Sequence, residues 1–259
     1  MPTFVGLDLA WTPTHETGVC VIRCDRGEAR LVALDTRIDT PEGFAALCLS
    51  GGDDVVAAID APLVVGPQRR ADSELAAQFS KFKAGAYSAT LPFLTKMNGL
   101  AGPTLARLLQ DANFELDPTR LSRGARGRFA LEVFPHPAHV ALFGLNMRLR
   151  YKKGTLASRR LALLDYQRHL AQLLSRELPH LLWSELMQQV LEPAAVDCTG
   201  RAMKQLEDKL DAVTCAYVAY HCWAHGQAGF RAFGCAEHGC IIVPRATLAA
   251  TCVRGRTSP

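Results

Sequence analysis

The chain of 259 residues lacks long hydrophobic runs, internal repeats and low-complexity segments. No apolar run is long enough to cross a bilayer, which excludes a membrane-spanning helix of the usual length. The first residues, MPTFVGLDLA, are strand-like and do not form a charged leader followed by an apolar signal. We therefore expect a cytoplasmic protein with no membrane partner.

The chain also has few aromatic residues, 7% in all, and no large excess of charge of one sign. The net charge of +4 permits a polyanionic partner without requiring one. The nine cysteines, an odd number, lie mostly inside apolar segments, which indicates reduced thiols and not a disulfide framework. Close to the carboxyl terminus, the spacing of His221, His225, Cys235, His238 and Cys240 matches no standard zinc site.

The order of the predicted elements indicates an α/β protein. Three β-rich runs at 4–11, 18–24 and 29–36 are separated by turns and predict a three-stranded antiparallel meander. A short helix after Pro41 and a buried strand in VVAAIDAPL follow. We expect one domain over 1–259, with an insertion at 65–128, a further strand in FALEVF, and a mainly helical part at 136–226 that packs on the sheet.

Four apolar runs each carry an acidic residue at or near their end: Asp8, Asp60, Glu132 and Asp211. A carboxylate inside an apolar segment is tolerated only when it is paired, hydrogen-bonded or bound to a cation. Four such residues therefore predict one shared site around a positive charge, most simply Mg²⁺ or Mn²⁺. Asp208, three residues before Asp211, lies on the same face of a predicted helix.

Strand alternation places Gly6 and Ala10 on the same face as Asp8, so the neighbours of this carboxylate are small. This pattern predicts room beside Asp8 for a metal ion and a substrate phosphate.

The motifs VGLDLAW, AAIDAPL, RRAD, LEVFPHPA, RYKKG, EDKLDAVTCAYVAY and EHGCIIVP occur in this order along nearly the whole chain. In this combination the sequence resembles the domain-of-unknown-function family 429 (DUF429), whose members are predicted nucleases with a ribonuclease-H-like fold. The resemblance implies a mixed sheet that begins with a three-stranded meander and continues with parallel strands, flanked by helices. It also implies acids on the first strand, the fourth strand and the closing helix.

A metal-dependent nuclease is the function that we expect from these residues. Asp8, Asp60, Glu132 and Asp211 are the predicted catalytic residues, and Asp8, Asp60, Asp208 and Asp211 the predicted metal ligands. Asp8 is the candidate for a bridging ligand. Glu132 and Asp208 fit a supporting structural role equally well.

Two basic clusters are candidates for contacts with nucleic acid. Arg123 and Arg126 belong to an arginine-rich stretch, and Lys153, together with Lys152, precedes a predicted helix, so each cluster could bind phosphate or lie on an ordinary solvated surface. Two other classes of function remain open: a catalytically silent binding module, and a phosphotransferase of the actin-like type. The latter is disfavoured because the chain has no repeated motif with glycine-rich phosphate loops.

Overall fold

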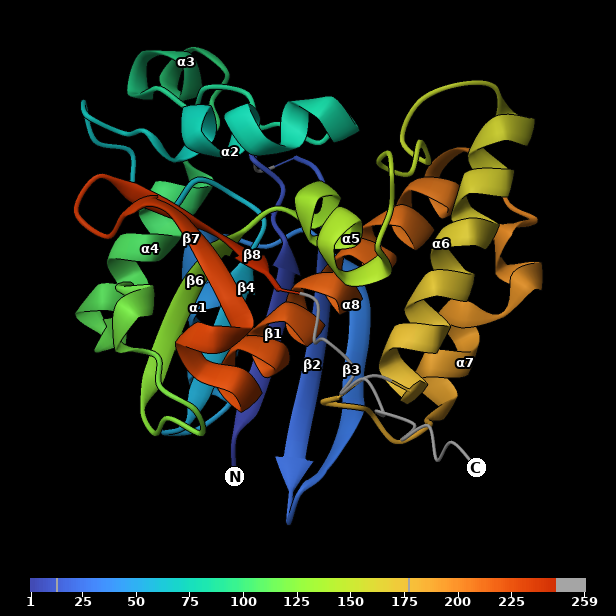
Figure 1. Cartoon of the computed structure of the whole chain (residues 1–259), viewed down its shortest axis with the longest axis horizontal. Helices are drawn as coiled ribbons and strands as arrows, with labels where there is room; N and C mark the ends of the chain where they lie inside the picture. Colours follow the sequence, from blue (N-terminus) through green and yellow to red (C-terminus); the bar gives the residue numbers. More distant parts are fainter. Residues whose placement is uncertain (13, 177, 246–259) are drawn as a thin grey trace, which may run out of the picture.

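A computed structural model of the chain describes residues 1–12, 14–176 and 178–245. In this part of the chain, eight strands form one sheet in the order β3-β2-β1-β4-β6-β8-β7, and β5 pairs with β6 (Figure 1). The strands are β1 (Thr3–Asp8), β2 (Thr17–Asp25), β3 (Glu28–Arg37), β4 (Val55–Ile59), β5 (Phe114–Glu115), β6 (Arg128–Val133), β7 (Phe230–Cys235) and β8 (Gly239–Pro244). Strands β3, β2 and β1 are antiparallel, whereas β1, β4, β6 and β8 run parallel. The expected α/β fold with a meander and parallel strands is confirmed.

Helices cover both faces of this sheet (Figure 1). The α-helices are α1 (Pro41–Leu49), α2 (Ala71–Phe79), α3 (Leu91–Lys96), α4 (Ala101–Asp111), α5 (Pro135–Phe143), α6 (Leu156–Arg176), α7 (Glu185–Leu191) and α8 (Gly200–His225). Helix α1 begins where the sequence predicts, because Thr40 caps it and Pro41 occupies its first turn. None of the helices in the described residues is both long and apolar enough to cross a membrane.

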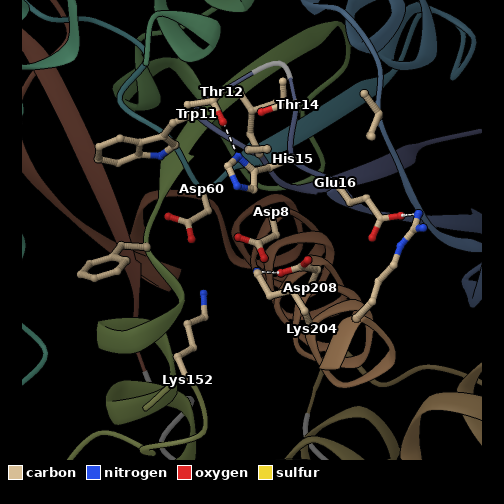
Figure 2. Close-up of a pocket in the computed structure, with 15 residues that line it drawn as sticks. Asp8, Trp11, Thr12, Thr14, His15, Glu16, Asp60, Lys152, Lys204 and Asp208 are labelled. Carbon is tan, nitrogen blue, oxygen red and sulfur yellow. Dashed lines mark hydrogen bonds and ion pairs between the residues drawn. The ribbon is translucent and has the colours of Figure 1, made fainter. Parts of the chain in front are cut away.

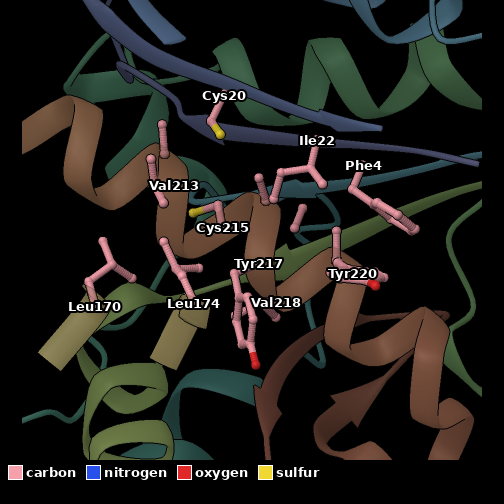
Figure 3. Close-up of a cluster of buried hydrophobic side chains, with 14 of the residues drawn as sticks. Phe4, Cys20, Ile22, Leu170, Leu174, Val213, Cys215, Tyr217, Val218 and Tyr220 are labelled. Atoms are coloured by element: carbon pink, nitrogen blue, oxygen red, sulfur yellow. The ribbon is translucent and has the colours of Figure 1, made fainter. Parts of the chain in front are cut away.

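Alternation along the strands divides the core into two layers. Phe4 and Ala58 pack toward α8, whereas Leu7 and Ile59 pack toward α1 and α4 on the other face. Figure 3 shows Phe4 on the α8 side beside Tyr220 of that helix. The face that a strand residue occupies therefore decides which helices it can meet.

Helix α8 lies directly against the backbone of the sheet beside Asp8. A Cβ atom on Gly6 would overlap the backbone of Ala212, and one on Gly18 would overlap the carbonyl of Asp208. The expectation that small neighbours of Asp8 leave room for a metal and a phosphate is thus wrong for Gly6. The space beside this glycine holds a helix, which lets the acids of α8 reach the end of β1.

The carboxyl-terminal part adds β7, a strand that the sequence analysis did not predict. The apolar GCIIVP segment is the strand β8, and β7 pairs with it as an antiparallel hairpin next to β6. The cysteines in the described residues are free thiols, most of them buried, as predicted; Cys252 lies outside the described residues.

Candidate functional site

Asp8 and Asp60 meet at the carboxyl ends of two neighbouring parallel strands. Asp8 is the last residue of β1, and Asp60 follows directly after β4. The backbone N–H of Asp60 donates to the carbonyl of Leu7 at 2.8 Å, so the strand pairing continues up to the two acids. Both side chains lie on the α8 face, because they continue the alternation of Phe4 and Ala58.

A cavity of about 760 Å³ opens above these two carboxyl groups. Its walls come from the loop after β1, the loop between α5 and α6, and the first half of α8. Figure 2 shows Asp8 between Asp60 and Asp208, with the ammonium group of Lys152 pointing toward them. The site therefore combines segments that are far apart in the sequence.

Asp8 and Asp60 hold a proton more tightly than ordinary carboxyl groups. Burial, with the nearby charge of Asp211, raises the pKa of Asp8 from 3.8 to about 7, although Lys152 opposes this shift. Burial and the neighbouring Asp8 carboxyl raise the pKa of Asp60 well above its usual value. Two such groups in contact cannot both be ionised unless a cation lies beside them.

Asp208 is the third acid of the cavity. Its Oδ1 atom forms an ion pair with Lys204, one helical turn earlier on α8. Its Oδ2 atom is buried, and no hydrogen-bond partner for it is found in the described part of the chain. Burial raises the pKa of Asp208, against the opposing effect of Lys204. The carboxylate is thus held by Lys204 and lies in contact with Asp8.

Asp211 lies deeper, with 0% of its surface exposed. Its Oδ1 atom accepts hydrogen bonds from the hydroxyls of Tyr151 and Tyr166, at 2.7 and 2.9 Å. Its Oδ2 atom is 2.7 Å from Nζ of Lys152. Burial acts to raise the pKa of Asp211, but Lys152 and the hydroxyl of Tyr151 hold it below its usual value. Both oxygens of Asp211 are therefore engaged by the protein itself.

The loop after β1 forms the opposite wall of the cavity. It carries Trp11, and Thr12, whose hydroxyl is hydrogen-bonded to His15. Glu16, at the end of this loop, is 2.6 Å from Arg201 and accepts a hydrogen bond of 3.0 Å from Gln205, both on α8. These contacts fasten the loop to the helix that carries Asp208.

Glu132 does not lie in this cavity, contrary to the grouping of the four acids expected from the sequence. It pairs in register with Ile59, so it points to the α1 and α4 face, one residue out of step with Asp60. There it receives two hydrogen bonds from the buried Arg69, at 2.5 and 3.0 Å, and one from the backbone N–H of Leu63. Arg69 also binds Asp72 of α2. This network is fully paired and holds the chain that leads into α2.

The predicted phosphate contacts Arg123 and Arg126 also lie away from the acids. Both precede β6, at the end of the parallel strands opposite to the end where Asp8 and Asp60 lie. Arg123 lines a separate cavity of about 540 Å³ beside Cys24 and Trp223. Lys153 is exposed and does not line the acid cavity.

The family comparison agrees with the order of motifs along the chain. The family described as "Protein of unknown function (DUF429)" matches residues 6–232. The chain belongs to the DUF429 family. No curated protein and no solved structure matches it significantly.

The basic residues of the DUF429 cavity are Lys152, Lys204 and Arg201. Lys152 belongs to the basic cluster that the sequence indicates before a helix, although Lys153 of that cluster was the predicted phosphate contact; Lys204 and Arg201 were not selected. Lys204 carried a second signal, since it precedes Asp208 by four residues on a helix. Nothing in the sequence separated the inward-facing lysine of the RYKKG motif from its exposed neighbour.

The acids of the DUF429 site do not form a ready-made cage for a metal ion. Within the described residues, no three His, Cys, Asp or Glu side chains are placed to hold one together. Asp211 is engaged by Lys152, and one oxygen of Asp208 by Lys204. Asp8 and Asp60 are the acids of the cavity that remain for a cation.

Proposed function

We propose that this DUF429 protein is a metal-dependent nuclease that hydrolyses phosphodiester bonds in the cavity above Asp8 and Asp60. The observation that carries the proposal is the contact between these two acids at the floor of an open cavity of about 760 Å³. Outside catalytic or ligand sites, such a pair is expected to be separated or matched with a cation. Two neighbouring carboxyl groups are typical ligands of a divalent cation.

The donor set fits magnesium or manganese better than a metal that needs several protein ligands. Mg²⁺ usually keeps several waters and is held by one or two carboxylates together with substrate phosphates. Asp8 and Asp60 would hold the ion, and Asp208 lies in contact with Asp8. When bound, such an ion makes water a better nucleophile and neutralises charge on the phosphoryl group.

An anionic substrate is favoured by the basic residues of the cavity. Lys152, Lys204 and Arg201 all line it, and Arg201 is largely exposed at its edge. These side chains can attract a phosphodiester and compensate for the acids below it. The proposal therefore moves the substrate contacts from Arg123, Arg126 and Lys153 to this group.

A nucleic acid, as opposed to a small phosphate ester, is favoured by Trp11. This residue lies beside the acids, and 38% of its surface is exposed. A Cβ atom placed on Gly99 would lie 3.5 Å from Cε3 of Trp11, so Gly99 is a neighbour of the indole. An exposed indole provides a stacking surface for a base. Trp11→Ala should raise KM for oligonucleotides several-fold and leave KM for a small aryl phosphodiester unchanged, which steady-state kinetics would measure.

Cleavage assays with single-stranded, duplex, hybrid and branched substrates test the proposed function. With magnesium or manganese, wild type should cleave at least one substrate, and Asp8→Asn or Asp60→Asn should lower kcat on the order of 100-fold or more. The double variant should be little worse than either single variant, because the two acids act as one unit. Asp111→Asn, at an exposed position, is the matched control and should cleave like wild type.

Three outcomes would contradict the proposal. Equal activity in wild type and Asp8→Asn, prepared in the same way, would indicate a contaminating nuclease. Inactivity of both proteins on every substrate, without ATP hydrolysis, would favour a silent binding module. ATP turnover that depends on Asp8 would favour a phosphotransferase.

A further inference from the structure

Lys152 forms an ion pair with Asp211, the most deeply buried acid beside the cavity. Among the described basic residues that line the cavity, Lys152 alone pairs with this acid. Its Nζ atom is 2.7 Å from Oδ2 of Asp211 and 5.7 Å from the ring centre of Tyr151. The side chain remains 34% exposed, on the side that opens to the cavity. It therefore connects a buried anion to the substrate space.

Asp211 is placed to hold this lysine and has little freedom to do anything else. Tyr151 and Tyr166 donate to its other oxygen, and the hydroxyl of Tyr166 is also hydrogen-bonded to His139, at 2.7 Å. The carboxylate can turn toward the cavity only if these buried hydrogen bonds and the ion pair are broken. Breaking these interactions would leave a buried carboxylate without its partners, which is strongly unfavourable.

The ammonium group of Lys152 retains donors for a ligand. It carries three N–H groups, and Asp211 is the one oxygen partner of Nζ found in the described part of the chain. Figure 2 shows this group directed toward Asp8 and Asp60 across the cavity. An oxyanion beside those acids would thus meet both the lysine and any cation that the acids hold.

We propose that Lys152 binds an oxyanion of the substrate's phosphoryl group, and that Asp211 is a positioning residue for this lysine and not a ligand of the cation. The inference rests on the proposed function, because it assigns a phosphoryl group to this cavity. It divides the acids into two classes. Asp8 and Asp60 bind the cation, whereas Asp211 positions Lys152, which binds the substrate.

Calorimetric titration with two probes, Mn²⁺ and inorganic phosphate, separates these classes. Asp8→Asn should weaken Mn²⁺ binding at least about 10-fold. Asp211→Asn should leave Mn²⁺ binding within about twofold and weaken phosphate binding by about 10-fold, the loss expected for one misplaced charged hydrogen bond. Phosphate is titrated both with and without millimolar magnesium.

Variants of the lysine test the anion contact itself. Lys152→Met should weaken phosphate binding by about 10-fold or more, and Lys152→Arg should restore part of it. Lys153→Met is the matched control and should bind phosphate like wild type, because this neighbour is exposed and outside the cavity. Since Lys152→Met leaves Asp211 without its counter-charge, the double variant Lys152→Met/Asp211→Asn provides a second protein without the lysine.

The results discriminate between the inference and the proposed function. The inference is wrong if Asp211→Asn weakens Mn²⁺ binding as much as Asp8→Asn, if the folded lysine variants bind phosphate like wild type, or if wild type binds no phosphate. If phosphate binding depends on Lys152 but the protein cleaves no ester, the anion site is supported and the proposed nuclease activity is contradicted. Cleavage that depends on Asp8 but not on Lys152 would support the nuclease and contradict the anion site.

Discussion

The burial of Asp8 makes stability depend on pH in the metal-free protein. The folded pKa of Asp8 is about 7, above its ordinary value of 3.8, so between these values the folded state binds more protons than the unfolded state. The contribution of Asp8 to stability is therefore full below pH 3.8 and is lost as pH rises toward 7. Buried histidines act in the opposite sense, because burial lowers the pKa of His136 to about 4.

The effect of Asp8 alone is therefore seen in the difference in stability between wild type and Asp8→Asn. The free energy of unfolding of wild type minus that of Asp8→Asn should fall by a few kcal/mol between about pH 4 and pH 7, in the presence of a chelator. At neutral pH the variant should be the more stable protein. Urea unfolding across this pH range measures the difference, and a difference that rises with pH would contradict the prediction. Millimolar magnesium should reverse the order at neutral pH.

Substitutions at Glu132 and at Asp60 should have opposite effects on stability and on activity. Glu132→Gln removes one of the two carboxylates that pair with the buried Arg69, and should lower the free energy of unfolding by about 3 kcal/mol while cleavage at low temperature is retained. Asp60→Asn should do the opposite: it should remove cleavage without lowering the melting temperature. Thermal melts and cleavage rates of the same preparations measure both effects, and loss of activity in folded Glu132→Gln would place Glu132 back in the site.

The proximity of Asp8 and Asp60 could be predicted from the sequence, but the position of Glu132 could not. Each acid stands near the end of an apolar strand, and parallel neighbouring strands bring such ends together. The register between β4 and β6 decides on which face Glu132 lies, and one residue of shift reverses it. The partners of Asp211 come from a loop and from α6, whose positions no local pattern specifies.

At the scale of elements, the approach of α8 to the meander determines whether the acids can meet. Gly6→Ala would place a Cβ atom on the backbone of Ala212, which cannot move without shifting the helix. We expect a loss of about 3 kcal/mol or more in the free energy of unfolding, at the upper end for overpacked cores. Gly99→Ala is the control, because its Cβ atom would meet its nearest neighbours at an ordinary distance of 3.5 Å. Chemical denaturation measures both variants, and equal losses would contradict this role of Gly6.

The meander and the long helices could be predicted because their signals are local. Alternation, turn residues and the Thr40 cap specify β1, β2, β3 and α1. The mainly helical part predicted at 136–226 contains α5, α6, α7 and α8, of which α6 (Leu156–Arg176) and α8 are the long helices. The two-residue strand β5 and the strand β7 were missed, since they exist through pairing with β6 and β8 more than through their own sequence.

At the scale of the whole molecule, the basic residues divide between two ends of the sheet. Arg201 and Lys204 lie beside the acid cavity, whereas Arg123 and Arg126 lie at the far end of the parallel strands. Alanine at Arg201 or Lys204 should lower nucleic-acid affinity and reduce its salt slope by about one unit for each phosphate that is no longer bound. Alanine at Arg123 or Arg126 should change neither quantity. Fluorescence anisotropy at several salt concentrations measures the slopes, and a reduced slope only in the second pair would reverse the assignment.

Because the chain is synthesised from its amino terminus, the cavity can form only after α8 has been made. Asp8 and Asp60 leave the ribosome early, Lys152 later, and Asp208 only with α8. Until that helix arrives, the backbone of Gly6 and Gly18 has no cover, and Asp8 lacks its neighbours from α8. A nascent chain therefore carries its first two acids without a finished cavity around them. For a nuclease, this delay would keep the incomplete protein inert toward the messenger from which it is being translated.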